Sequence, residues 1–314
     1  GDHVLLPDNS YGPNKVLAEG ELTSFGISHT YYDAMNPQDL ATKIQANTKL
    51  VWLEAPGSVS MEFPDLIQLI RICKTHSVIT ALDNTWGAGL AFKPFDLLGD
   101  GSLSVDLTAH ALTKYPSGGG DVLMGSVTTR RDDVARTLKL SHMRLGFGVG
   151  ANDVELVLRS LPSMALRYAA HDQSCRTVAA WCLQQPAFAQ VLHPAVVGSP
   201  GHDHWRRLCA ADAPSTQAIH ASGAAASLLG LRFQPTLSAN QIDIFCNALK
   251  LFKLGYSWAG PISLVVPYDL KGMRQHAPQA LLEGAYVRLA IGLEDPQDLI
   301  ADLAQALQQA LSQG

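Results

Sequence analysis

The stretch KLVWLEAPGSVSMEFPDLIQLIRICKTHSVITALDNT, residues 49–85, decides the fold. Residues 49–56 are an apolar run that ends at a Pro-Gly turn, and residues 64–76 place their apolar side chains on one helical stripe. Residues 77–85 are again a short, apolar, β-branched run. Strand, helix and strand within about thirty residues make a βαβ unit, in which the two strands are parallel and the crossover is right-handed. The stretch therefore predicts an open α/β sheet.

The residues that follow predict further strands of this sheet, and the pattern then becomes mainly helical. Residues 104–112 and 121–129 are further strand candidates, whereas residues 152–185 are mostly helical, with a kink or restart expected at Pro162. Later strands are expected at three places: residues 225–233, 256–266 and 285–293. The pattern predicts a mostly parallel α/β domain at 1–160 and a smaller C-terminal α+β domain at 161–314.

The C-terminal stretch DPQDLIADLAQALQQAL, residues 295–311, predicts an amphipathic helix. Asp295 is in a position to cap it, and Pro296 suits its first turn. The expected buried stripe has five members: Leu299, Ile300, Leu303, Leu307 and Leu311.

Composition excludes several classes of protein. The chain has 314 residues, is 47% hydrophobic and 16% charged, and carries a net charge of −5, which suits a large core. Without a basic run, nucleic acid and anionic membranes are not expected partners, and no apolar run is long enough to span a bilayer. Five widely spaced cysteines without a C-x-x-C pair indicate reduced thiols in a cytoplasmic protein. The pair His202 and His204 lacks further ligands nearby, so we interpret it as an exposed polar loop and predict no metal site.

Two charged residues follow expected parallel strands, where ligands of open α/β sheets bind. Asp83 ends one strand and Lys114 follows the next, so both could face one pocket. Each has a simpler interpretation, because an Asp at a strand end can cap a turn and a loop lysine can be solvated. Together they form either an ion pair or the pair that pyridoxal phosphate needs, in which the lysine makes a Schiff base and the carboxylate keeps the ring nitrogen protonated. A cofactor-free Schiff-base lyase or aldolase is a further possibility for Lys114.

The segments LDNTWGAG (82–89) and HALTKYPSGGGDVLMG (110–125) resemble the Cys/Met-metabolism, or trans-sulfuration, branch of fold type I pyridoxal-phosphate enzymes. The resemblance implies a transferase-like α/β fold with pyridoxal 5'-phosphate as the cofactor. By this resemblance Lys114 carries the cofactor, Asp83 binds the ring nitrogen and Thr113 bonds the phosphate. Tyr11 matches the tyrosine that stacks on the ring and helps with proton transfer. Arg288 matches the arginine that clamps the substrate carboxylate, a role suited to a planar guanidinium.

The triplet Tyr256-Ser257-Trp258 resembles cystathionine β-lyases of the bacterial type, whereas γ-acting relatives usually have Leu at the tryptophan position. The resemblance implies that these residues line the substrate site. Ser257 would position the carboxylate with Arg288, and Trp258 would narrow the pocket near the Cβ–S bond. The implied reaction cleaves L-cystathionine, a small amino-acid thioether, to homocysteine, pyruvate and ammonia in methionine biosynthesis. A γ-acting trans-sulfuration enzyme and an aromatic strand packed in the small domain are the alternatives.

The resemblance also implies features outside these residues. The family has a Gly-rich phosphate-binding turn, and a segment that reaches into the neighbouring subunit, upstream of the strand that begins this sequence. We therefore expect the N-terminal part of the family fold to be absent, so that a truncated, cofactor-free chain is one alternative. Ala111 stands where relatives often have Ser, which removes one phosphate contact. The expected assembly is a homotetramer built from two dimers.

Overall fold

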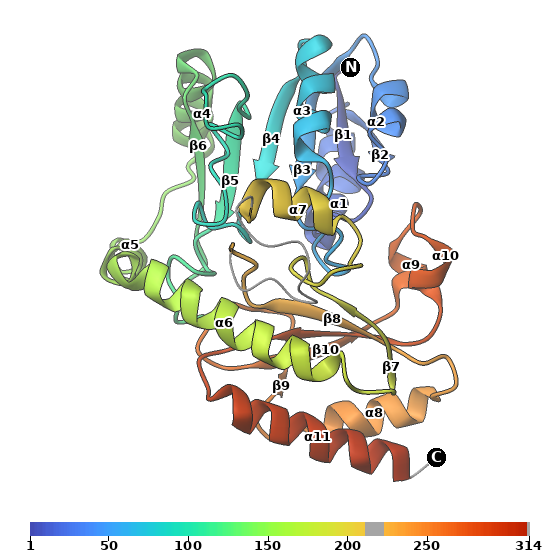
Figure 1. The fold of residues 1–314 in the computed structure, drawn as a ribbon. Helices are drawn as coiled ribbons and strands as arrows, with labels where there is room; N and C mark the ends of the chain where they lie inside the picture. Colours follow the sequence, from blue (N-terminus) through green and yellow to red (C-terminus); the bar gives the residue numbers. More distant parts are fainter. Residues whose placement is uncertain (211–222, 313–314) are drawn as a thin grey trace.

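The computed structural model describes residues 1–210 and 223–312. Two sheets lie one above the other in Figure 1, with helices packed around each. The upper sheet has six strands and the lower sheet has five. The chain completes the upper sheet before it begins the lower one.

The six-stranded sheet has the order β2-β1-β3-β4-β5-β6. Its first five strands are parallel, and β6 runs antiparallel to β5. The neighbours β3 and β4 are joined by helix α3 (Leu66–Thr75), which confirms the predicted βαβ unit. The strands are β1 (His3–Pro7), β2 (Ser28–Tyr32), β3 (Thr48–Glu54), β4 (Ile79–Asp83), β5 (Leu107–Ala111) and β6 (Gly125–Thr129).

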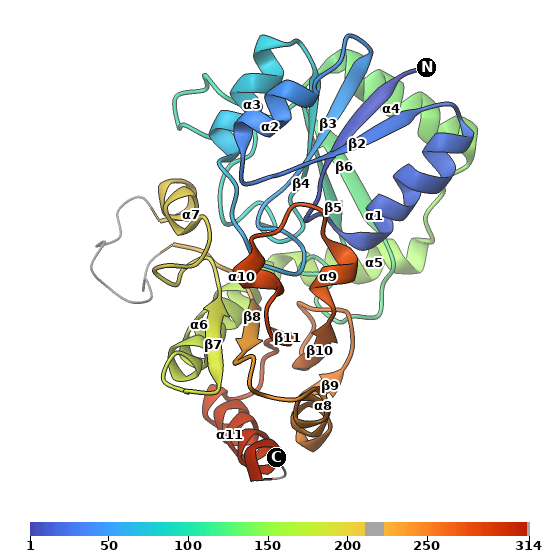
Figure 2. The ribbon, with the colours of Figure 1, turned by 90° about the vertical axis from the view of Figure 1, so that its right-hand side faces the viewer.

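Helices cover both faces of this sheet (Figure 2). Helices α2 (Pro37–Lys43) and α3 lie on one side, and α1 (Gly12–Leu17), the π-helical turn η1 (Ala18–Leu22) and α4 (Asp132–Leu145) lie on the other. Leu53 packs with the α3 side, whereas Leu6 packs with Ala18 and Leu107 packs with Val134. Burial on both faces explains why the strands are continuous apolar runs rather than alternating ones.

A helical segment connects the two sheets. Helix α5 (Ala151–Ser160) passes through a single turn of 3₁₀ helix, η2 (Leu161–Ser163), into α6 (Met164–Cys182), so the chain restarts at Pro162 as predicted. Strand β7 (Phe188–Leu192) and helix α7 (His202–Cys209) follow. His202 is buried in α7, with its Nδ1 2.9 Å from the carbonyl oxygen of Pro194, so the predicted exposed loop is wrong. The described residues contain no group of three or more His, Cys, Asp or Glu side chains that could hold a metal ion.

The five-stranded sheet has the order β7-β8-β11-β10-β9. The strand predicted at 256–266 begins only at Leu264, because Ala259 has a positive φ of 63° and Pro261 has no N–H for a strand ladder. The remaining strands are β8 (Leu228–Phe233), β9 (Lys253–Leu254), β10 (Leu264–Tyr268) and β11 (Tyr286–Ala290). The remaining helices are α8 (Ala239–Ala248), α9 (Leu270–Met273), α10 (Gln279–Leu282) and α11 (Pro296–Ser312).

Helices α6, α8 and α11 pack on one face of this sheet (Figure 1). Asp295 begins α11 as predicted, since its Oδ1 accepts the N–H of Gln297 at 2.8 Å. Leu311 is 49% exposed, so its predicted burial is wrong. Ala310 takes the buried position of the last turn, three residues after Leu307.

The middle strand β11 divides its side chains between two cores. Val287 and Leu289 point into the core under the helices. Tyr286 and Ala290 point the other way, into the core shared with the first sheet. Arg288 lies midway between these two in the strand, so its side chain points to the same side. The strand thus directs an arginine toward the six-stranded sheet.

Two general features complete the description. Within the described residues, no helix has both the length and the apolarity that crossing a membrane requires. The five cysteines are free thiols, and four of them are buried.

Candidate active site

The candidate site lies at the carboxyl ends of β3, β4 and β5. Glu54 and Asp83 are register partners at the ends of β3 and β4. Asp83 pairs with Ala109 in β5, and Lys114 follows β5 after a short turn. The parallel strands therefore bring Asp83 and the lysine turn to one sheet edge, as the sequence predicts.

The lysine turn is tight because its backbone bonds to itself. The N–H of Lys114 donates to the carbonyl of Ala111 at 3.1 Å, and the N–H of Gly118 donates to the carbonyl of Lys114 at 2.8 Å. Gly118 and Gly120 have positive φ angles of 67° and 75°, which glycine adopts without strain. The glycine run thus shapes the loop that presents Lys114.

The Lys114 side chain reaches the second sheet. Its Nζ donates to Ser257 Oγ at 2.9 Å and lies 5.2 Å from the centre of the Trp258 ring. Burial lowers the pKa of Lys114 from 10.5 to about 8, and the positive charge of Arg288 contributes to the same shift. A lysine in this state is available as a base and a nucleophile near neutral pH.

Tyr115, next to the lysine, anchors the turn to the second sheet. Its ring is fully buried and packs edge-on against Trp258, with the ring centres 5.8 Å apart. Its hydroxyl donates to Ser227 Oγ at 2.8 Å and accepts the N–H of Ser227 at 3.0 Å. Sequence reasoning missed this anchor, because Ser227 lies 112 residues away in the chain.

Asp83 is held apart from Lys114. Its Oδ1 accepts the N–H of Thr85 at 2.9 Å, and within residues 1–210 and 223–312 no ion pair joins it to Lys114. Burial raises the pKa of Asp83. The simple ion-pair interpretation therefore fails, and the carboxylate suits a cationic ligand atom.

Glu54 is a second carboxyl group at this edge, and sequence reasoning missed it. Its Oε2 accepts the backbone N–H of Tyr11 at 2.9 Å. Burial, together with the negative charge of Asp83, raises the pKa of Glu54 well above its usual range. The sequence signal that could have identified Glu54 is its position at the end of β3, which is equivalent to that of Asp83 at the end of β4. Glu54 fixes the backbone of Tyr11, whose side chain is more than half exposed.

Arg288 is 4% exposed, so its side chain is buried and does not face solvent. Its Nη2 donates to the carbonyl of Tyr256 at 2.6 Å and its Nη1 to the carbonyl of Ser58 at 3.4 Å, while its buried Nε has no partner among the residues that the structure describes. In the described part of the chain no carboxylate pairs with it. A buried guanidinium held by neutral carbonyls suits a carboxylate ligand.

Two tyrosines flank the arginine. The guanidinium carbon of Arg288 lies 5.3 Å from the centre of the Tyr268 ring, and Tyr268 and Tyr256 meet edge-on with ring centres 6.0 Å apart. The Tyr256 side chain is exposed, so its present contact with Arg288 is through its backbone carbonyl. Nothing in the sequence marks Tyr268, which ends an ordinary strand.

Thr113 faces away from the lysine toward β6. Its hydroxyl accepts the N–H of Met124 at 3.2 Å and lies 3.4 Å from the carbonyl oxygen of the same residue. To donate to a phosphate, the hydroxyl has to give up only its 3.4 Å contact with the carbonyl of Met124, and the phosphate contact stays a prediction.

The edge of this mostly parallel α/β sheet presents a lysine of lowered pKa, an acceptor for a cationic ring atom and a buried arginine. Together these features define the class of fold type I pyridoxal-phosphate enzymes. The crystal structure of MetB from Corynebacterium glutamicum superposes with a TM-score of 0.83 at 26% identity, over 98% of this chain and 75% of that one. The family model of the Cys/Met metabolism PLP-dependent enzymes matches residues 1–308. The chain belongs to this family, and its cofactor is pyridoxal 5'-phosphate.

Curated relatives agree with this assignment. The chain is 37% identical to a cystathionine beta-lyase from Bordetella avium, over 99% of this chain and 72% of the relative. It is 31% identical to the cystathionine beta-lyase MetC of Escherichia coli K12, over 96% and 73%. It is also 32% identical to an L-alanine/L-glutamate racemase from Wolbachia pipientis wMel, over 98% and 71%.

Proposed function

We propose that this protein is a pyridoxal-phosphate-dependent carbon–sulfur β-lyase that cleaves L-cystathionine to homocysteine, pyruvate and ammonia, a step of methionine biosynthesis. The observation that carries the proposal is the Lys114 amine, which lies between Ser257 Oγ and the Trp258 ring and is influenced by the charge of Arg288. The cystathionine beta-lyases among the relatives support it.

The residues present fit the cofactor. Lys114 would bond its aldehyde, and the half-buried Asp83 would face its ring nitrogen, where a positive charge relieves the cost of burying the carboxylate. Bound in this way, the cofactor supplies an electron sink for the charge left on the substrate Cα after proton removal. Tyr11, fixed by Glu54 at the same edge, would stack on the ring.

Lys114 is the proposed base. With a pKa of about 8, roughly a tenth of the amine is uncharged at pH 7. Once the substrate amine has replaced it on the cofactor aldehyde, the freed, uncharged Nζ would take the proton from Cα and then donate it to the sulfur that leaves Cβ, so that the proton moves along one face of the substrate. Ser257 Oγ, at 2.9 Å, orients the amine between these two positions.

Arg288 would hold the substrate α-carboxylate through its unpartnered Nε and its Nη atoms. Trp258 forms the wall beside the lysine, supported from behind by Tyr115. An indole at that wall restricts the space around Cβ, which favours cleavage of a Cβ–S bond over a reaction at Cγ. This wall is the structural support for a β-lyase over its γ-acting alternatives.

The first experiment is an absorbance spectrum of the purified chain with pyridoxal phosphate, before and after borohydride. We expect a visible band that borohydride bleaches, with the label on Lys114. Lys114→Ala should lose the band and about a thousandfold or more in turnover, whereas Lys139→Ala, in exposed helix α4, should retain both. A band that persists in Lys114→Ala would refute the assigned lysine.

Product analysis then separates the candidate reactions. Cleavage at Cβ of cystathionine gives pyruvate, and cleavage at Cγ gives 2-oxobutyrate. Formation of D-alanine from L-alanine, without either keto acid, would favour the activity that names the racemase relative.

We place the enzyme in the cytoplasm, because five free thiols suit a reducing compartment. We also propose that it works as a homotetramer. The support is a group of exposed apolar side chains along the segment from α4 to α6, for which the Discussion gives a test.

A further inference from the structure

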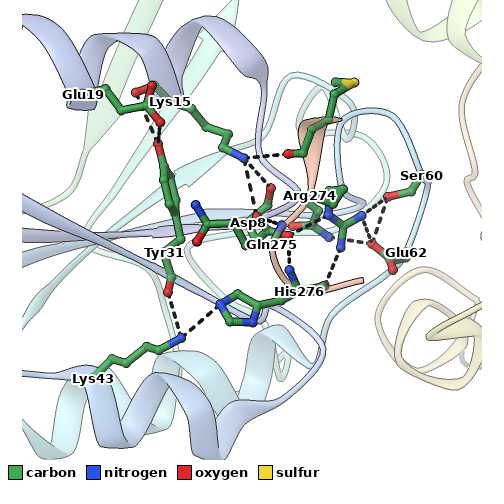
Figure 3. A network of polar contacts seen from close by, with 12 residues as sticks. Asp8, Lys15, Glu19, Tyr31, Lys43, Ser60, Glu62, Arg274, Gln275 and His276 are labelled. Carbon is green, nitrogen blue, oxygen red and sulfur yellow. Dashed lines mark hydrogen bonds and ion pairs between the residues drawn. The ribbon is translucent and has the colours of Figure 1, made fainter. Parts of the chain in front are cut away.

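A network of charges joins the two sheets beside the candidate site (Figure 3). Its centre is Arg274, which follows α9 and is 5% exposed. Its Nε donates to Asp8 Oδ2 at 2.8 Å, and its Nη1 donates to Glu62 Oε2 at 2.9 Å. The two carboxylates are 1% and 0% exposed, so one buried guanidinium bridges two buried acids.

The two acids belong to different turns of the first sheet. Asp8 follows β1, and Glu62 lies in the turn after β3. Asn9 ties these turns together, since its Nδ2 donates to Glu62 Oε2 at 3.2 Å and its carbonyl accepts the N–H of Ser58 at 2.9 Å. Arg274 therefore fastens a loop of the second sheet to two adjoining turns of the first.

Each of the three segments that Arg274 joins carries part of the candidate site. Tyr11 follows Asp8 by three residues. The turn with Glu62 supplies the carbonyl of Ser58 to Arg288. The loop with Arg274 begins at Tyr268, whose ring lies against the Arg288 guanidinium. The bridge thus joins the segments that carry the groups expected to meet the cofactor ring and the substrate carboxylate.

The bridge requires the planar, forked arrangement of N–H donors that a guanidinium group provides. Arg274 uses Nε toward Asp8, Nη1 toward Glu62 and Ser60, and Nη2 toward the carbonyl of His276 at 3.0 Å. A lysine keeps the charge but presents one compact ammonium, which cannot hold these directions at once. Lys15 also contacts this network: its Nζ donates to the carbonyl of Met273 at 2.9 Å and lies 3.5 Å from Asp8 Oδ1.

We propose that Arg274 is a positioning residue for this reaction. It holds the segments 8–11, 57–62 and 268–276 in one arrangement, so that Tyr11 and Arg288 face the same amino-acid substrate. The proposal rests on the proposed function, because it assigns Arg274 to the same site.

The test uses Arg274→Lys, with Arg131→Lys as the matched control. Arg131 also bridges two carboxylates, Asp106 at 2.9 Å and Asp133 at 2.6 Å, and it does so at the opposite end of β5 from Lys114. Hydrogen exchange of the full chain without cofactor reports on the bridge directly. We expect exchange about tenfold faster or more at the amides of Ser58, Gln275 and His276 in Arg274→Lys, and no change at them in Arg131→Lys.

Kinetics of the cofactor-loaded variants report on positioning. We expect Arg274→Lys to raise KM for cystathionine about tenfold while kcat falls less than about threefold and the borohydride-sensitive band remains. Unchanged exchange would overturn the bridge. A KM within twofold of the parent, or a loss of activity that only follows the folded fraction measured by circular dichroism, would overturn the positioning role. If the parent chain forms no keto acid, the proposed function fails, and the exchange experiment alone decides whether Arg274 holds the segments.

Discussion

At the scale of single residues, Lys114 and Arg288 are the two basic groups at the edge of the site, and the environment of each disfavours its charged form. Burial is the main cause of the lowered pKa of Lys114, and burial lowers the pKa of Arg288 as well. The Arg288 charge adds to the shift at Lys114. Lys114 can therefore react with an electrophile, such as the aldehyde of the cofactor. Arg288 can bind an anion, such as the carboxylate of an amino acid.

The pKa of Lys114 makes a testable prediction on the chain without cofactor. Because the folded pKa is lowered, the reactive uncharged amine should appear as pH rises through about 8 instead of 10.5. Acylation at Lys114, followed by mass spectrometry, should rise about tenfold per pH unit below the midpoint and level off above it. Arg288→Met should move the midpoint upward, but not fully to 10.5, because burial remains. A midpoint near 10.5 in the parent chain would contradict the environment that we describe.

At the scale of elements, β8 and β11 pack closely because Gly230 in β8 has no side chain. Gly230 in β8 pairs with Arg288 in β11, and a Cβ at Gly230 would lie 1.8 Å from the hydroxyl oxygen of Tyr286. That hydroxyl donates to the carbonyl of Val59, next to Ser58. The glycine therefore lets β11 contact the turn that supports Arg288.

Gly230→Ala should force the Tyr286 ring to move and break its bond to Val59. We expect a loss of about 1–3 kcal/mol in the free energy of unfolding, measured by denaturant titration, together with a higher KM. Gly125→Ala in β6 is the control, because a Cβ there meets only the carbonyl oxygen of His110, at an ordinary 3.5 Å. Equal stability of the two variants would show that β8 and β11 adjust freely.

At the scale of the whole molecule, apolar side chains gather outside the core along the segment from α4 to α6. A group of exposed apolar side chains of this kind marks a candidate protein–protein contact surface. Its exposed members are Met143, Leu145, Phe147, Val149, Leu156, Leu158, Leu161 and Leu166. The same segment leads from the strand after the lysine turn into the second sheet, so a subunit packed on it would lie close to the site.

We expect the chain to elute as an oligomer, with a mass by light scattering that is a multiple of 33.7 kDa. Phe147→Asp together with Leu158→Glu should reduce that mass, because charges on an apolar interface are not compensated there. Gln308→Glu at an exposed position of α11, outside this segment, is the control for added charge. A monomeric parent would exclude the proposed homotetramer for this chain.

Much of the fold was predictable, because the patterns that define it are local. The βαβ unit, the restart at Pro162 and the C-terminal helix follow from periodicity and from proline positions within short windows. The same reasoning failed at residues 256–262, where a positive φ and a proline end the strand pattern. It also failed at His202, which is buried through a contact with Pro194 in the connection that leads from β7 into α7.

By itself, the sequence determined the class of fold, the family signature around Asp83 and Lys114, and the sheet edge at which both lie. These depend on neighbouring residues and on the rule that parallel strands end together. The tertiary structure alone decided that Arg288 is buried, that Glu54 and Tyr268 join the site, and that Arg274 bridges Asp8 and Glu62. Arg288 and Ser58 are 230 residues apart in the chain, and Arg274 and Asp8 are 266 apart. Such partners have no pattern in sequence, because the packing of one sheet against the other brings them together.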